Sequence, residues 1–148
     1  MMWVKKRFDE LTPLEVFQIY KARVAVFVVE QACPYPEVDD EDLTSVHVWY
    51  EEKGRLVAYA RIIPKEDCVK IGRVIVAKER RGEGFGRALM KEVLVWVEEH
   101  ERTLPIVLQA QTYLQSFYES FQFEVTSDSY EEDGIPHIDM KRLPFSKK

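Results

Sequence analysis

Apolar residues recur along the chain with two periods, and these periods predict where helices and strands lie. Spacing of i, i+3 and i+4 is typical of amphipathic helices, and it predicts helices over residues 12–29, 85–100 and 113–121. Runs rich in β-branched and aromatic residues favour strands, which we predict at 1–10, 47–52, 55–63, 69–76, 105–110, 123–129 and 135–143. The element order is then β-α-β-β-β-α-β-α-β-β, a mixed α/β fold with one parallel crossover through the helix at 85–100.

The first helix carries signals at both of its ends. Thr12 suits an N-cap, Pro13 suits the first helical position, and Glu15 closes a capping box. Pro34 prevents the helix from continuing. The segment 37–42 that follows is strongly acidic. We interpret it as a solvated loop; the alternative is that its carboxylates lie at the rim of a pocket and attract a cationic amine.

Composition and charge narrow the class of protein. The chain has 148 residues, 46% of them hydrophobic and 32% charged, which is typical of one soluble globular domain spanning 1–148. The net charge of −5 argues against a nucleic-acid partner or an anionic membrane surface. The N-terminal residues lack the apolar core of a signal peptide. Cys33 and Cys68 show no metal-binding spacing. We therefore expect free thiols, a cytoplasmic location and no metal.

The strand at 69–76 runs into a glycine-rich turn and then into the long helix. The turn reads Arg80-Arg81-Gly82-Glu83-Gly84-Phe85-Gly86-Arg87. Its alternate glycines leave peptide N–H groups open to a bulky anion, and the helix dipole favours the same charge. The turn lacks the Gly-Lys-Ser/Thr ending of a P-loop, and Leu89 stands where a dinucleotide fingerprint needs its third glycine. The sequence therefore predicts a phosphate or pyrophosphate cradle, with an ordinary glycine-rich connection as the alternative.

The motif Arg81-x-x-Gly84-x-Gly86 resembles the acyl-coenzyme A pyrophosphate signature of the GNAT N-acetyltransferase superfamily. Residues 113–123 resemble the late helix of these enzymes, with Gln122 where glycine is usual. Three further stretches are similar to the ElaA group in particular, at 23–35, 58–61 and 130–140. The resemblance covers almost the whole chain. It implies a GNAT fold, with a mixed, mostly antiparallel central sheet that splays at its parallel strand pair and helices on both faces.

The resemblance also implies roles for particular residues. The cosubstrate acetyl-CoA would be held mainly by backbone groups at Val74, Ile75, Val76, Arg81, Gly82, Glu83, Gly84, Phe85, Gly86 and Arg87. Tyr118 is the matching position for the general acid, because a phenol stays protonated at neutral pH and can donate to a departing thiolate. The alternative for Tyr118 is a core tyrosine with a hydrogen-bonded hydroxyl.

The general base and the acceptor site are less sharply defined by the sequence. Candidates for the base are Glu30, Glu131, His137 and a water chain, and we place Glu30 in the catalytic set. For binding of the acceptor we predict Arg23, Tyr35, Arg73 and His137. Arginines within apolar elements need partners, so internal ion pairs with Glu30 or with the acidic segment are an equal alternative for Arg23 and Arg73.

Together these features predict an acetyl-CoA-dependent N-acetyltransferase that moves the acetyl group directly to a primary amine, in our interpretation that of a small molecule. One alternative is a protein or peptide N-acetyltransferase, and another is a non-catalytic acyl-CoA-binding regulator. Neither cysteine lies in a motif typical of a nucleophile, so no acyl-enzyme is expected. A monomer and a homodimer both remain open.

Overall fold

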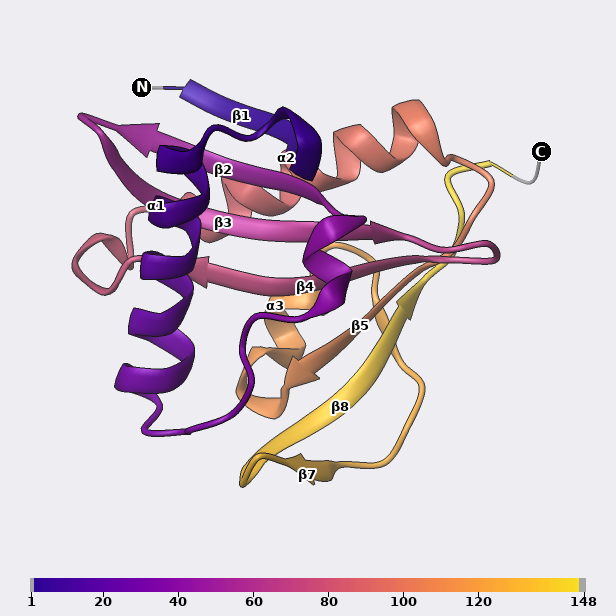
Figure 1. Cartoon of the computed structure of the whole chain (residues 1–148). Helices are drawn as coiled ribbons and strands as arrows, with labels where there is room; N and C mark the ends of the chain where they lie inside the picture. Colours follow the sequence, from indigo (N-terminus) through magenta and orange to yellow (C-terminus); the bar gives the residue numbers. More distant parts are fainter. Residues whose placement is uncertain (1, 147–148) are drawn as a thin grey trace.

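A computed structural model describes residues 2–146 and shows a mixed sheet with helices on both of its faces (Figure 1). The strands are β1 (Met2–Arg7), β2 (Val46–Glu52), β3 (Arg55–Pro64), β4 (Val69–Val76), β5 (Ile106–Gln111), β6 (Glu124–Val125), β7 (Tyr130–Glu132) and β8 (Ile135–Arg142). The helices are α1 (Pro13–Val24), α2 (Phe85–His100) and α3 (Gln115–Glu119). Five short helical turns complete the chain: η1 (Phe8–Glu10), η2 (Ala25–Glu30), η3 (Asp40–Leu43), η4 (Lys78–Arg80) and η5 (Thr112–Leu114).

The described strands form one eight-stranded sheet in the order β1-β2-β3-β4-β5-β8-β6, with β7 also paired to β8. Every pairing is antiparallel except that of β4 with β5. The residues from β4 to β5 contain α2, as expected for a parallel crossover. The predicted mixed α/β fold is therefore confirmed.

Two apolar clusters hold the layers together. Ile19 of α1 and Val26 of η2 pack with Trp49, Tyr59 and Ile75 on one face of the sheet. The other face carries the larger cluster, to which α2 contributes its fully buried residues Leu89, Met90, Val93 and Val97. The alternation of side chains along each strand supplies both clusters, because successive residues point to opposite faces.

The first helix begins as predicted but ends differently. The Thr12 side chain accepts a hydrogen bond from the Glu15 N–H, and the Glu15 side chain bonds back to the cap, so the capping box is confirmed. Regular helix stops at Val24, and residues 25–30 form a π-helical turn. The turn is closed by the Gln31 N–H, which donates to the Val26 carbonyl at 3.2 Å. Single π turns often occur at functional sites because they widen a helix and redirect its side chains.

The parallel strand pair splays. β4 pairs with β5 only from Val69 to Ile71, and beyond that point the edge of β4 that faces β5 has no partner strand among the described residues. β4 also carries a bulge, because Arg61 and Tyr59 of β3 pair with Gly72 and Ile75, which are three residues apart. Arg73 lies inside this bulge with φ 53°. A bulge re-aims backbone groups locally, so the free edge of β4 opens toward the gap.

The prediction of one continuous strand at 123–129 was wrong. This segment forms β6, a two-residue strand, and then a loop before β7. The Thr126 N–H donates to the Asp139 carbonyl, and the Asp139 N–H donates to the Ser127 hydroxyl, both at 2.9 Å. These two bonds hold the loop against β8 in a bulged arrangement, which a regular strand ladder does not contain.

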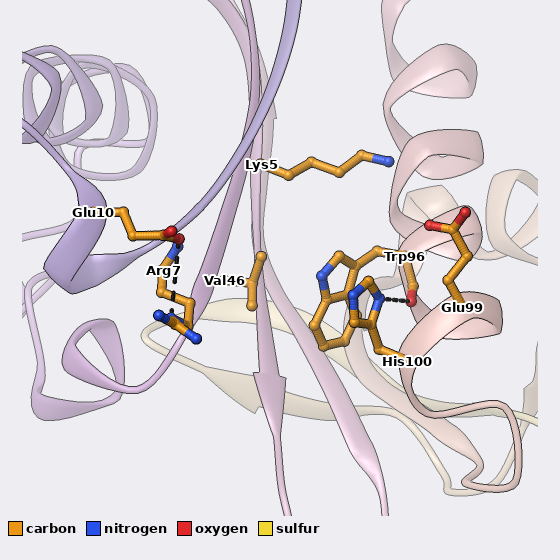
Figure 2. A pocket seen from close by; sticks show the side chains of 7 residues that line it. All are labelled: Lys5, Arg7, Glu10, Val46, Trp96, Glu99 and His100. Carbon is orange, nitrogen blue, oxygen red and sulfur yellow. Dashed lines mark hydrogen bonds and ion pairs between the residues drawn. The ribbon is translucent and has the colours of Figure 1, made fainter.

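A surface hollow of about 350 Å³ lies near β1, the edge strand of the sheet (Figure 2). Its lining includes Trp96 and His100, whose rings stack at 4.4 Å between centroids. Several polar groups at its rim have partners: Lys5 pairs with Glu92 at 3.1 Å, and Arg7 pairs with Glu10 at 3.9 Å. His100 ends α2, whereas the glycine turn precedes the start of that helix, so the hollow is separate from the predicted cradle. It contains none of the predicted site residues.

Candidate active site

A cleft of about 480 Å³ follows the splay between β4 and β5 and brings together segments far apart in the sequence. Its lining comes from η2, the bulged half of β4, the end of β5, α3 and the turn between β7 and β8. Two predicted site residues from opposite halves of the chain, Arg73 and Tyr118, both line it. Among residues 2–146 no group of three or more His, Cys, Asp or Glu side chains is arranged to hold a metal.

The glycine turn at the start of α2 has the geometry expected of an anion site. The first helical hydrogen bond is donated by the Ala88 N–H to the Gly84 carbonyl at 3.1 Å. The N–H groups of Phe85, Gly86 and Arg87 therefore have no helical partner and carry the positive end of the helix dipole. Gly84 adopts φ 90°, and a Cβ added there would meet no atom within 4 Å. The space beside the turn is thus open to a bulky phosphate group.

The side chain of Arg81 is anchored rather than free. Its Nε donates to the Val76 carbonyl at 3.1 Å, and its two terminal nitrogens bond to Glu30 at 2.6 and 2.9 Å. The hydrogen bond from Arg81 lowers the pKa of the Glu30 carboxyl. Glu30 therefore lies beside the cradle as an ion-pair partner that joins η2 to the turn. A carboxylate held in this way is a weak proton acceptor, so the geometry does not favour Glu30 as the base.

The predicted cosubstrate residues divide into three groups. Five of them line the cleft: Val74, Ile75, Val76, Arg81 and Gly86. Four others lie exposed on the turn or at its end: Gly82, Glu83, Gly84 and Arg87. The Phe85 side chain instead packs against Tyr50, with 5.1 Å between ring centroids, so this residue can offer only its backbone.

Tyr118 reaches the cleft from the opposite side of the splay. Its side chain is 4% exposed and packs edge-on against the rings of Phe117 and Phe123. Burial raises the pKa of its hydroxyl, which therefore stays protonated at neutral pH. No described group forms a hydrogen bond with this hydroxyl, while the residue lines the cleft. The alternative of a core tyrosine with a hydrogen-bonded hydroxyl thus lacks its partner in the described part of the chain.

Three of the four residues predicted to bind the acceptor line the cleft: Tyr35, Arg73 and His137. The Arg73 guanidinium lies 5.6 Å from the centroid of the Tyr35 ring and 5.9 Å from that of Phe27. The charged and aromatic groups therefore form one wall. His137 lies on β8, which is far from Tyr35 and Arg73 in the sequence. It reaches the same cleft because β8 lies next to β5 in the sheet.

Arg23, the fourth residue predicted to bind the acceptor, is not brought to the cleft. Arg23 is fully buried and does not line the cleft. Its Nε and Nη2 bond to the Glu37 carboxylate at 2.6–2.9 Å, and its Nη1 bonds to Asp42 at 2.7 Å. The alternative of an ion pair with the acidic segment is the one observed, since a buried guanidinium needs partners for its charge and its donors.

The acidic segment is accordingly not a solvated loop. Glu37 and Asp42 are buried, and they bind arginines from three different elements. Besides Arg23, these are Arg61 on β3 and Arg73 in the bulge. Arg73 donates to Glu37 at 2.7 Å and to Asp39 at 3.4 Å. These bonds tie the left-handed residue of the bulge to the acidic segment, which stabilises the shape of the free β4 edge.

Acid should weaken this network in two stages. Burial lowers the pKa of His47, so the unfolded chain takes up that proton first and stability begins to fall below about pH 6.5. Burial alone would raise the pKa of Asp42, but hydrogen bonds and charge from Arg23 and Arg61 outweigh it and lower that pKa. Stability from Asp42 is thus present above its ordinary pKa and lost as pH falls below about 4.

Urea denaturation at steps from pH 7 to pH 3 would measure both stages. We expect the unfolding midpoint to fall shallowly below about pH 6.5 and steeply below about pH 4. The variant His47→Gln should lose the first stage and keep the second. A midpoint that stays constant down to pH 3 would contradict the role assigned to the buried carboxylates.

Gly84→Val should weaken coenzyme A binding by about tenfold or more, because the new side chain occupies the open space beside the turn. Gly54→Val is the matched control: Gly54 also has a positive φ, 74°, and open surroundings, but it lies in the β2–β3 hairpin. Isothermal titration would compare the two variants. Equal affinities for coenzyme A in both folded variants would argue against the cradle.

The fold and the cleft combine a splayed parallel strand pair, a bulged free edge and a glycine turn at the start of a helix. Together these features define a class of protein, the acyl-CoA N-acyltransferases. The chain belongs to the family described as "Acetyltransferase (GNAT) domain", which matches residues 15–144. A UPF0039 protein of Schizosaccharomyces pombe is 45% identical over 142 residues, with 94% of this chain and 95% of that protein covered. The resemblance to the superfamily seen in the sequence is confirmed.

Bacterial relatives agree in sequence and in structure. Protein ElaA of Escherichia coli is 43% identical over 145 residues, which are 95% of each chain. Its crystal structure superimposes with a TM-score of 0.93, covering 96% of this chain and 99% of that one. An acyl-CoA N-acyltransferase from Pseudomonas aeruginosa also has a TM-score of 0.93, at 38% identity, covering 97% of this chain and 100% of that one. The resemblance to the ElaA group is thereby confirmed as well.

Proposed function

We propose that this protein is an acetyl-CoA-dependent N-acetyltransferase that moves the acetyl group directly to a primary amine of a small molecule. The observation that carries the proposal is the continuity of the cleft. Its lining joins Arg81 and Gly86 at the turn, the free edge of β4, and Tyr118. The pyrophosphate, the pantetheine arm and the thioester of coenzyme A need these three environments in that order.

The chain offers a specific contact for each part of acetyl-CoA. Free N–H groups at the start of α2 suit the pyrophosphate. The unpaired edge of β4 suits the amides of the pantetheine arm, which can bind as an added strand does. Within this edge the Val76 carbonyl is already taken by Arg81, which leaves the backbone groups nearer the bulge for the arm and the thioester oxygen.

Acyl transfer needs an oxyanion donor, a proton acceptor and a proton donor. The amine nitrogen bonds to the thioester carbon, and the C–S bond breaks as the tetrahedral intermediate collapses. A peptide N–H between Val74 and Val76 would stabilise the oxyanion, and Tyr118 would protonate the thiolate sulfur. Cys33 lines the cleft, but transfer through its thiol would need an acyl-enzyme intermediate. Direct transfer needs no such intermediate, because Tyr118 supplies the acid and the free edge of β4 supplies the oxyanion donor.

The setting of the enzyme follows from the same features. No helix within the described residues has the length and apolarity to cross a membrane. The acidic net charge of −5 supports acetyl-CoA and an amine as partners rather than nucleic acid, and a cytoplasmic location is part of the proposal. The acidic carboxylates of Glu132 and Asp133 at the acceptor side of the cleft favour a cationic amine.

The proposal is tested by ligand-dependent stability and then by turnover. Coenzyme A and acetyl-CoA should each raise the melting temperature, because a ligand that binds only the folded state stabilises it. A library of small amines and of short peptides, assayed by release of the free thiol, would then identify the acceptor. Peptide acetylation without turnover of small amines would favour a protein acceptor, and binding without any turnover would favour a regulator. Absence of a thermal shift at millimolar coenzyme A would overturn the proposal.

A further inference from the structure

His137 of β8 lies on the face of the sheet opposite to the one that packs against α2 and α3. Its neighbours Ile138 and Met140 belong to the apolar cluster formed with α2 and α3. Successive side chains of a strand face opposite ways. His137 and Asp139 therefore share one face of the sheet, and Ile138 and Met140 share the other, which faces the core. Both His137 and Tyr118 line the cleft, although Tyr118 comes from the α3 side. The two groups therefore meet the splay from opposite faces.

The structure determines which nitrogen of His137 carries the proton. Nδ1 lies 2.7 Å from the Ile135 carbonyl oxygen. A carbonyl oxygen can only accept a hydrogen bond, so Nδ1 is protonated and donates. In the neutral ring Nε2 then holds a lone pair, and no group in residues 2–146 bonds to it.

Neighbours of the ring hold its orientation. The rings of His137 and Tyr130 lie nearly parallel, at 20° with 6.2 Å between their centroids. The Tyr130 hydroxyl donates to the Asp139 carboxylate at 2.6 Å. Tyr130 and Asp139 therefore act as positioning residues, because they keep the imidazole in place without contacting the reacting atoms.

The other carboxylates considered for the base are less suitable. Glu30 is paired with Arg81 beside the cradle. Glu131 is exposed on β7 and does not line the cleft. Glu132, the last residue of β7, lines the cleft, but it is exposed to solvent.

We propose that His137 is the general base of the transfer reaction, an inference that rests on the acetyltransferase function proposed above. Nε2 takes a proton from the ammonium group of the acceptor, and the freed nitrogen lone pair forms the bond to the thioester carbon. As the C–S bond breaks, the sulfur takes the proton of the Tyr118 hydroxyl. The imidazolium then releases its proton to solvent. The nitrogen of the intermediate also loses its second proton, through water, and an equivalent proton returns to the Tyr118 oxygen. The ammonium group thus gives up two protons, of which one ends in solvent and one on the thiol. Protons balance over the cycle.

Several charged and titratable groups surround the imidazole. From β7 and the following turn these are Tyr130, Glu132 and Asp133, and from β8 itself Asp139. Tyr118, Tyr35, Arg73 and Glu30 line the same cleft. A general base acts only in its unprotonated form, so we expect turnover to fall toward acid pH, with a limb that disappears when the imidazole is removed.

Two substitutions separate a catalytic from a structural role. Asn at this position places its amide nitrogen where Nδ1 lies, so His137→Asn keeps the bond to the Ile135 carbonyl and removes the base. His137→Gln places its amide near Nε2 and loses that bond. If His137 is the base, both variants should lose about 100-fold or more in kcat. If His137 is only structural, His137→Asn should retain the wild-type kcat, and that result would overturn the proposal.

Further measurements make the outcome specific. Both variants should show the wild-type thermal shift with coenzyme A. Glu131→Gln, at an exposed residue of β7 that does not line the cleft, should keep kcat within a few-fold of the wild type. With an acceptor amine that is already unprotonated at the assay pH, the loss in His137→Asn should shrink markedly. An undiminished loss with that amine would also overturn the assignment. Wild-type protein without turnover of any amine would instead refute the acetyltransferase function itself, so the two failures are distinguishable.

Discussion

Tyr118→Phe is expected to lower kcat by about 100-fold or more while leaving coenzyme A binding intact. The substitution removes only a hydroxyl that no described residue hydrogen-bonds, and the ring keeps its edge-on contacts with Phe117 and Phe123. The lost proton donor forces the thiolate to leave unprotonated or to use water. Steady-state kinetics with thiol detection would measure the loss, and isothermal titration would measure binding.

Tyr113→Phe is the matched control for this prediction. Tyr113 lines the same cleft and precedes the same helix, but its side chain is 76% exposed. Its hydroxyl is free to exchange with solvent, so its removal should change kcat by no more than a few-fold. A wild-type kcat in Tyr118→Phe would refute the general-acid assignment, and equal losses in both variants would trace the effect to the cleft as a whole.

Arg23→Met is expected to lower the free energy of unfolding by about 3–5 kcal/mol. The substitution leaves the carboxylates of Glu37 and Asp42 buried, with the charge of their main partner removed. Methionine fills much of the same volume, so the loss reports the charge more than the packing. Since a domain of this size has only about 5–15 kcal/mol of stability, the variant should unfold at far lower urea. Urea denaturation at pH 7 would measure it.

Arg55→Met controls for the loss of an arginine as such. Arg55 is exposed at the start of β3, and such surface substitutions usually change stability by about 0.5 kcal/mol or less. Arg23→Lys provides a second variant should the first fail to fold: it keeps the charge but cannot bond to both carboxylates as the guanidinium does. A loss in Arg23→Met no larger than that in Arg55→Met would contradict the structural role of Arg23.

Much of the site was predictable because it depends on local sequence. Alternate glycines before an apolar helical pattern define an anion site whatever surrounds them, and the structure places Gly84 at φ 90° as the cap of α2. The capping box at Thr12 is equally local. Gln122 marks the limit of such inference: it adopts φ 72°, the conformation for which glycine is favoured, even though its side chain makes this unusual.

Other features depend on long-range contacts and were missed. The sequence at 25–30 has the pattern of an ordinary helix, yet it forms a π turn. Glu30 at the end of this turn bonds to Arg81, 51 residues away. The acidic segment reads as a solvated loop because its partners lie on α1, β3 and β4. The one available signal was the presence of Arg23, Arg61 and Arg73 within apolar elements, since buried arginines require acidic partners.

By itself the sequence determined the order of the elements, the turn that opens α2 and the family to which the chain belongs, because apolar periodicity, caps and glycines act over a few residues. The tertiary structure alone decided which charges are internal and which face the cleft. Arg23 and Arg73 are both arginines in apolar elements, yet the first is sealed beneath the acidic segment and the second lines the site. Burial depends on which elements pack together, and this is set by sheet order and by contacts between distant segments.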